Sequence, residues 1–500
     1  MTLAARAAKI GKMGSIYTVG SFIPLFAGIF LLPIYTRYLI SEQMGIVRLA
    51  TQFVGVMGVF IELGISAALK RHYFQVDPEQ RPQLVRTAFW GQIMQAGLIC
   101  TVLSAAGVFV SEMALPNLPL NSQQIYILWL MIVWGGFFQA VSQLGIGVTA
   151  LQERPFASVS IRLLTFAVQA SLGISAVVLL SWKGFGRQFT VMIGTITGGL
   201  LAGAYLFTAG KGGFEFRTFR KILKTGLTFV PHRISGMLSL AINAWLVTKF
   251  LGSAAIGIYS VAIMFPSMIQ LPLWSLGRAM YPTLAELMRD GTAEAKRQQS
   301  RLYTLVAIAI SVMILGVAVL GPILVRVLTA PQYHEAAQYV PLLTLAWLFQ
   351  GLYIVASQPV FFTGGGLWMA AATVSSVLAN LVLSIILIPL FGIYGAAFSM
   401  IGCFVARFIV IAVISHKQYP LPWEAGKLLR ILSAVAVLAA LDQILLTRLD
   451  IWLSVCLKAA VILSFIPALW MVKAVSTAEI VRLKTFVFAR FAKSRKNRTQ

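Results

Sequence analysis

The residues of this chain that could do chemistry are charged side chains set inside long apolar stretches. Glu62 is the only Asp or Glu deep within such a stretch. Several cations and one titratable His accompany it: Arg162, Arg233, Arg407, Lys458, Arg278 near a stretch end, and His232 beside Arg233. Charges in a bilayer are costly, so surplus cations need an anionic ligand or a route to water. Because a guanidinium can bind two phosphate oxygens at once, the pattern indicates a phosphate-bearing ligand.

Each charge also has a simpler interpretation. Long cationic side chains near a helix end can extend to the lipid headgroups, and we expect this of Lys458 and Arg278. Glu62 could be protonated, or bound by a neighbouring backbone group. For Arg233 and Arg407 a position at a cavity is favoured.

These charges are positioned by a chain that is 59% hydrophobic and only 11% charged, unlike a soluble globular protein. Runs of about twenty apolar residues, the length that crosses a bilayer core, occur fourteen times. The expected spans are 14–36, 44–69, 84–110, 123–150, 156–181, 188–209, 225–249, 254–280, 302–325, 337–361, 367–389, 393–415, 428–447 and 451–473. The sequence therefore predicts an all-α polytopic membrane protein.

Lys and Arg are distributed unevenly between the two sides of these spans. With the N-terminus in the cytoplasm, 29 of the 40 fall in cytoplasmic segments and only 7 outside, Arg48 among them. Both termini are then cytoplasmic, and the net charge of +25 reflects this asymmetry rather than nucleic-acid binding. Cys100, Cys403 and Cys456 lie inside spans and carry no disulfide or metal signal, and we expect no cofactor.

A sequence repeat organises the spans. The stretch Thr36-Arg-Tyr-Leu-Ile-Ser-Glu-Gln-Met-Gly-Ile-Val47 returns without a gap as Thr248-Lys-Phe-Leu-Gly-Ser-Ala-Ala-Ile-Gly-Ile-Tyr259, at an offset of 212. Leu63-Gly64 corresponds to Leu276-Gly277 at an offset of 213 residues. Duplication of a block of about six helices predicts two parallel lobes around a central cavity, with two extra helices at the end.

The first helix of each lobe is interrupted at a matching place. The first span contains Pro24 among other Gly and Pro residues, and the seventh holds Pro231 and Gly236. Proline bends a helix, although transmembrane helices tolerate it. Matched broken helices point to the translocation site of a transporter. We expect Pro24 to act as a hinge, and the turn cations Arg37 and Lys249 to form part of a gate.

Repeat and composition together divide the chain into four parts. We expect an N-lobe at 1–224, a C-lobe at 225–418, two further spans at 419–473 and a basic cytoplasmic tail at 474–500. The tail keeps apolar residues at helical spacing among many cations, which is typical of a helix on anionic lipid or of a disordered segment.

Short motifs at the repeat turns carry a resemblance to a known family. They are Tyr35-Thr-Arg-Tyr-Leu, Gly45-Ile, Phe250-Leu-Gly252, Gly257-Ile-Tyr-Ser-Val-Ala262 and Pro282-Thr-Leu. The chain resembles the bacterial polysaccharide-biosynthesis membrane proteins, the oligosaccharide-lipid flippases of the multidrug, oligosaccharidyl-lipid and polysaccharide exporter superfamily. Members often carry an Asp-Arg pair where this chain has Asn243-Ala244.

The resemblance implies a flippase of the bacterial inner membrane that works by alternating access on a polyprenyl-pyrophosphate-linked oligosaccharide. Membrane lipids and other polysaccharide-assembly membrane proteins are the candidate partners. We expect the pyrophosphate or headgroup to meet Arg162, Arg233, Arg278, Arg407, His232 and Asn243. Glu62 with His232 would respond to protons or cations and switch the lobes.

Three alternatives stay open on the sequence. A lipid-linked peptidoglycan-precursor flippase shares the span count and the cationic cavity. A cation-coupled multidrug exporter would line its cavity with acids, and one deep Glu argues against it. An enzyme acting on lipid-linked sugars is disfavoured, because the outside loops are short and no two deep carboxylates are paired.

Overall fold

The computed structural model describes residues 16, 20, 22–24, 27–363, 365–445 and 451–471. The side chains at 231–233, 235–236, 278–279, 282, 443–445, 451–456, 466, 468 and 471 lie outside this description. The predicted site residues His232, Arg233 and Arg278 are therefore placed by their backbone alone, and the predicted tail at 474–500 lies outside the described residues.

Within the described ranges the regular secondary structure is all helical, with no β-strand. The first half contains the apolar helix Phe22–Tyr38, α2 (Ser41–Glu62), α3 (Ile65–Tyr73), α4 (Arg81–Ala114), α5 (Ser122–Leu151), α6 (Pro155–Ile174), the π-helix η1 (Ser175–Leu179) and α7 (Lys183–Ala209). The second half contains α8 (Phe216–Ser267), α9 (Gln270–Asp290), α10 (Ala293–Leu328), the 3₁₀-helix η2 (Pro331–Tyr339), α11 (Val340–Phe362), α12 (Gly366–Phe391), α13 (Ile393–Gln418), α14 (Ala425–Leu445) and α15 (Ile451–Met471).

Ten stretches of helix within the described residues are long and apolar enough to cross a membrane. They follow the predicted runs closely, except that the seventh and eighth runs lie in one stretch, Met237–Gly277. The first helix, Phe22–Tyr38, is shorter, and α14 and α15 have 21 residues each. The protein is thus an all-α multi-pass membrane protein, and the count of fourteen spans stays a prediction.

Local chemistry explains where several helices begin and end. Asn121 caps α5, because its side-chain oxygen accepts a hydrogen bond from the Gln124 backbone N–H at 2.8 Å. Pro155 opens α6, where its missing N–H costs nothing. Gly252 is the only non-helical residue within α8, with φ 85° and ψ 178°. It marks the turn that the sequence predicts between the seventh and eighth spans.

The chain divides into two compact units. Unit 1 comprises 1–262, 325–339 and 370–406, and unit 2 comprises 263–324, 340–369 and 407–500. The lobe boundaries at 224 and 418 stay a prediction.

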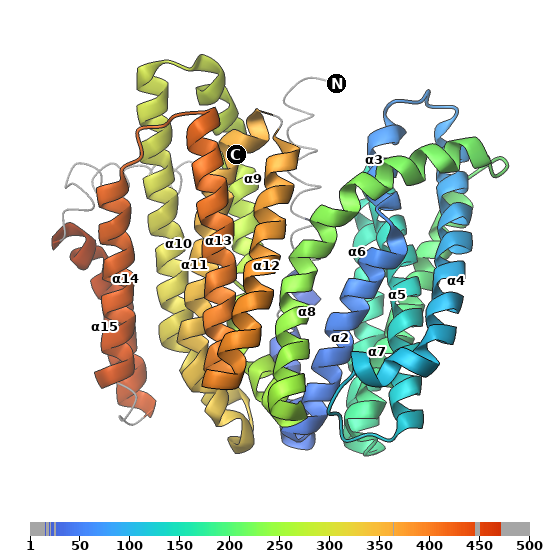
Figure 1. The fold of residues 1–500 in the computed structure, drawn as a ribbon, viewed down its shortest axis with the longest axis horizontal. Helices are drawn as coiled ribbons and strands as arrows, with labels where there is room; N and C mark the ends of the chain where they lie inside the picture. The colour runs from blue at the N-terminus through green and yellow to red at the C-terminus, as the bar shows by residue number, and fades with distance from the viewer. Residues whose placement is uncertain are drawn as a thin grey trace, which may run out of the picture. The chain divides into compact units, whose positions relative to one another are not determined.

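In unit 1, α5 is the central helix of the first half. It contacts α2, α4, α6 and α7, which run lengthwise beside it (Figure 1). An apolar core joins α3, α4, α5 and the start of α8, with Leu69, Val85 and Leu144 among its fully or almost fully buried members. In a bilayer such a core is stabilised mainly by close van der Waals packing, because lipid tails are as apolar as the side chains themselves.

In unit 2, α9 contacts α11, and α14 lies beside α15 (Figure 1). Asp442 of α14 and Lys458 of α15 form an ion pair at 2.6 Å, and each is almost fully buried. The prediction that Lys458 extends to the headgroups is therefore wrong. Its ammonium finds a carboxylate on the neighbouring helix, which offsets the cost of holding it in the bilayer.

Candidate functional site

The cavity with the clearest chemistry lies in unit 1, between α3, α5 and α6. Its volume is about 350 Å³. Two cationic side chains line it, Lys70 from α3 and Arg162 from α6, together with polar groups and small residues. The polar members are Ser66, Gln143 and Ser158. An ammonium, a guanidinium and two hydroxyls around one space form a set that can bind phosphate oxygens.

A break between α2 and α3 positions the first of these groups. Leu63 and Gly64 have left-handed φ values of 47° and 73°, so α2 ends at Glu62 and α3 begins afresh at Ile65. Ser66 and Lys70 follow one another at i and i+4 and therefore share a face of α3. Gly64 also lies against the backbone carbonyl of Gly226 in α8, where a Cβ would not fit.

Glu62 stands at this break and is fully buried. Its Oε1 accepts a hydrogen bond from the Ser66 backbone N–H at 3.1 Å, in the first turn of α3. A carboxylate at a helix N-terminus is stabilised by the unsatisfied N–H groups and the helix dipole. This hydrogen bond supports the simpler interpretation of Glu62, in which a neighbouring backbone group binds its carboxylate.

Helix α5 lies close to α3 at the wall of this cavity. Gly147 faces α3, and a Cβ at this position would lie 2.9 Å from the Ser66 hydroxyl and 3.5 Å from Lys70 Cε. An added Cβ would therefore displace the Ser66 hydroxyl and come into ordinary van der Waals contact with Lys70. Lys70 is a functional candidate that the sequence did not single out, because it reads as part of a polar loop until α3 is seen to extend through Tyr73.

Arg407 lies in unit 2 on α13, with 7% of its surface exposed. Its Nη1 donates to Gln350 Oε1 at 3.4 Å, and its guanidinium lies 5.5 Å from the centre of the Tyr353 ring. Both partners belong to α11. These contacts favour a packed position, with the cation held over an aromatic face.

Asn243 belongs to a buried polar network of unit 1. The Ser384 hydroxyl donates to its Oδ1 at 2.8 Å, and its Nδ2 donates to the Ala396 carbonyl at 3.4 Å. Asn380 Nδ2 donates to the Ser239 carbonyl at 2.9 Å in the same region. These bonds join α8 to α12 and α13, and Asn243 is 1% exposed. They indicate that Asn243 connects helices.

Arg48, which the charge count assigned to an outer segment, lies within helix α2, and its side of the membrane stays a prediction. It lies in the second turn of α2, beside the fully buried Tyr259 of α8. With the Gln52 amide turned to present its oxygen, that oxygen accepts from Arg48 Nη1 at 3.1 Å.

At one end of unit 1 the two repeat turns lie against each other. Gly45 faces the carbonyl of Ser253, and Gly257 faces the carbonyl of Ser41, each so closely that a Cβ would not fit. Because 41 and 253, like 45 and 257, are related by the offset of 212, the two contacts are equivalent. The repeats meet here through a self-complementary surface.

Segments following α4 and α10 complete this end of unit 1. Asn117 Nδ2 donates to the Lys249 carbonyl at 2.7 Å. Gln332 Nε2 donates to the carbonyls of Thr36 and Leu39 at 3.1 Å, and the Tyr333 hydroxyl donates to Leu39 at 2.8 Å. Each repeat turn is thus held by a segment from elsewhere in the chain. We call these turns and their contacts the turn lock.

Two predicted gate residues lie in the turn lock. Lys249 takes part through its carbonyl, while its ammonium lies 4.9 Å from the centre of the Trp245 ring. Arg37 is exposed. Pro24 lies in the first helix and is half-buried. Of the predicted site residues, Arg162 lines the cationic cavity and Asn243 belongs to the buried network, whereas no described contact joins these two residues.

A model of the polysaccharide biosynthesis protein family matches residues 10–288, which is more than half of the chain. The chain belongs to this family. The resemblance drawn from the repeat-turn motifs is thereby confirmed. A curated relative, the succinoglycan biosynthesis transport protein ExoT of Rhizobium meliloti (strain 1021), is 25% identical over 327 residues. That match covers 63% of this chain and 61% of ExoT, so it spans less than two thirds of the relative's length.

Solved structures of this fold come from membrane transport proteins. The lipid II flippase MurJ in an inward closed conformation is similar with a TM-score of 0.70, at 14% identity, over 90% of this chain and 97% of that one. An inward-facing multidrug resistance MATE transporter of the MOP superfamily is similar with a TM-score of 0.65, at 13% identity, over 81% and 98%. At such identities the likeness concerns the fold alone.

Proposed function

We propose that this protein is a flippase that moves a polyprenyl-pyrophosphate-linked oligosaccharide, such as a polysaccharide or O-antigen repeat unit, across the bacterial inner membrane. The observation that carries the proposal is the cavity where Lys70 and Arg162 face the same space among hydroxyl groups. A pyrophosphate presents the oxygens that such a set binds. Membership of the family and the printed role of ExoT in succinoglycan transport support the same cargo class.

The turn lock supports alternating access as the mechanism. With both termini in the cytoplasm, as the loop cations favour, the turns at Thr36 and Thr248 lie on the outer side. The described state then has its outer turns joined. Opening this side separates Gly45 from Ser253 and Gly257 from Ser41, and breaks the hydrogen bonds to Lys249, Thr36 and Leu39. Cargo would enter from the cytoplasmic side, meet Lys70 and Arg162, and leave after the turns part.

The test is transport by purified protein in proteoliposomes, with a fluorescent lipid-pyrophosphate oligosaccharide as cargo. Lys70→Gln and Arg162→Gln should each slow transport roughly tenfold or more, since hydrogen bonds to charged groups contribute about 1.5–3 kcal/mol. Lys211→Gln removes an exposed loop cation and serves as the matched control. Wild-type rates in both cavity variants would refute the site.

Two further arms of the same experiment separate the alternatives. Vesicles are offered a lipid-linked peptidoglycan precursor, and in parallel a cationic dye under a proton gradient. Faster movement of the peptidoglycan precursor than of the oligosaccharide would favour the first alternative. Dye movement without lipid movement would favour the multidrug exporter, and would mean that the cationic cavity does not bind the cargo.

A further inference from the structure

A second cavity lies wholly within unit 2 and has a different character. It occupies about 540 Å³ between α10, α11, α13 and α14, and its walls are almost entirely apolar. Leu352 and Val355 of α11 and Ala412 of α13 line it, opposite Leu428 and Leu432 of α14. A dry cavity of this kind accepts an apolar ligand rather than ordered water, because its walls offer water too few hydrogen bonds.

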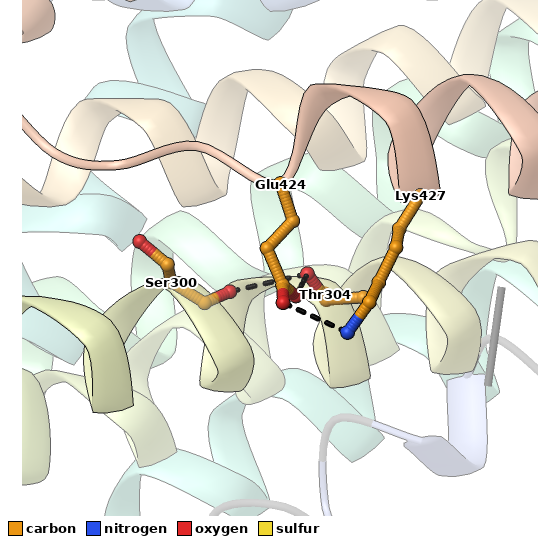
Figure 2. Close-up of polar contacts among 4 residues, drawn as sticks. All are labelled: Ser300, Thr304, Glu424 and Lys427. Atoms are coloured by element: carbon orange, nitrogen blue, oxygen red, sulfur yellow. Dashed lines mark hydrogen bonds and ion pairs between the residues drawn. The ribbon is translucent and has the colours of Figure 1, made fainter. Parts of the chain in front are cut away.

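The segment that connects α13 to α14 contributes Trp423 to the wall of this groove, next to Tyr303 of α10. The Trp423 ring stacks on the Tyr303 ring, with centres 5.3 Å apart and planes at 21°. Glu424 fixes the segment, because the Thr304 hydroxyl donates to its Oε2 at 2.6 Å and Lys427 Nζ lies 2.8 Å from its Oε1 (Figure 2). Thr304 also donates to the Ser300 carbonyl at 3.2 Å. The groove therefore has a fixed aromatic end.

The charges around this end are mostly positive. His416 and Lys417 line the groove itself, in the last turn of α13. The carboxylate of Glu424 accepts hydrogen bonds from Lys427 Nζ and the Thr304 hydroxyl. Nearby, Lys296 lies 5.1 Å from the centre of the Tyr419 ring. Burial, followed by the charge of Asp290, raises the pKa of the Tyr419 hydroxyl.

An apolar groove with cations at one end matches an amphipathic anion. In a bilayer, acyl chains surround every such groove, and basic pockets between helices at the cytoplasmic side favour anionic headgroups. We propose that the groove binds an acyl chain of an anionic phospholipid from the cytoplasmic leaflet, with the headgroup phosphate at Lys417. The choice of leaflet rests on the topology in the proposed function, whereas the groove and its charges do not.

The experiment is native mass spectrometry of the purified full-length protein, incubated with phosphatidylglycerol or phosphatidylcholine of the same acyl chains. We expect phosphatidylglycerol to be retained about fivefold more than phosphatidylcholine, the ratio that one interfacial cation contributes. Lys417→Gln should abolish this preference while retention of phosphatidylcholine is unchanged. Ala412→Trp fills the groove and should lower the retention of both lipids.

Matched variants keep the outcome interpretable. Lys221→Gln removes an exposed cation of unit 1, and Ala371→Trp adds the same bulk at an exposed position of α12. Both should retain lipid as the wild type does. Equal retention by wild type, Lys417→Gln and Ala412→Trp would overturn the proposal. So would preferential retention of a polyprenyl phosphate over phosphatidylglycerol at the same concentration. Because binding is measured without transport, failure of the flippase assay leaves this result unaffected.

Discussion

Gly257 lies directly against the backbone carbonyl oxygen of Ser41. Gly45 lies against the carbonyl of Ser253 in the same way, so the contact occurs twice. Thr36 and Thr248, also separated by 212, are both fully buried and donate to the carbonyl four residues earlier, at 2.9 and 2.7 Å. The repeat seen in the sequence is therefore preserved in side-chain contacts, and its two copies meet at the turn lock.

The first prediction concerns these glycines. Gly45→Ala or Gly257→Ala places a Cβ within 3.0 Å of a backbone carbonyl, which cannot move without shifting a helix. We expect each variant to be less stable by about 1–3 kcal/mol, as overpacked sites are. Thermal unfolding of the detergent-solubilised protein measures this. The accessibility of cysteines introduced at the turns should rise in parallel, because the two turns are pushed apart.

Gly316→Ala is the matched control for both glycine variants. It lies in α10, and its added Cβ would meet nothing within 4 Å. This control should match or slightly exceed wild-type stability, since Ala favours a helix over Gly. Wild-type stability in Gly45→Ala and Gly257→Ala would show that the two turns do not interlock as described.

A second prediction tests whether Asn243 joins helices or binds cargo. Asn243→Ala removes the partner of the Ser384 hydroxyl in a buried setting, so we expect a loss of about 1–3 kcal/mol in stability. Asn243→Ala combined with Ser384→Ala should recover part of that loss, because the Ser384 hydroxyl that lost its partner is then also removed. A direct cargo contact predicts the reverse, with unchanged unfolding and a higher KM for transport.

Much of the fold can be predicted from this sequence, because hydropathy and an ungapped repeat are long-range signals. Apolar runs locate helices, and the break at Gly252 falls where the repeat predicts a turn. Side-chain pairing is harder to predict, since it depends on helix rotation. Nothing in the local sequence joins Lys458 to Asp442, or brings Lys70 beside Arg162.

The third prediction separates two roles of Glu62. Glu62→Gln keeps an oxygen that can accept the Ser66 N–H, whereas Glu62→Ala removes it. We expect the Gln variant to unfold at the wild-type temperature and the Ala variant to lose about 1 kcal/mol, as lost N-terminal caps do. If Glu62 also couples transport to protons, Glu62→Gln should flatten the dependence of transport on pH. An unchanged pH profile in Glu62→Gln would leave helix capping as its role.

The fourth prediction concerns the ion pair of Asp442 and Lys458. Lys458→Met leaves the Asp442 carboxylate buried without its ammonium, and we expect a loss of roughly 3–5 kcal/mol. The double variant Asp442→Leu with Lys458→Met removes both charges and should regain most of that stability, because apolar side chains replace a pair whose desolvation is costly.

Thermal unfolding of Lys458→Met, Asp442→Leu and the double variant gives the coupling energy between the two side chains directly. Lys183→Met serves as the control, since it removes an exposed Lys at the start of α7. If α14 and α15 depend on the pair, protease cleavage within these two helices should be faster in Lys458→Met than in the double variant. Equal cleavage and equal unfolding in all three variants would mean that apolar packing alone holds the two helices together.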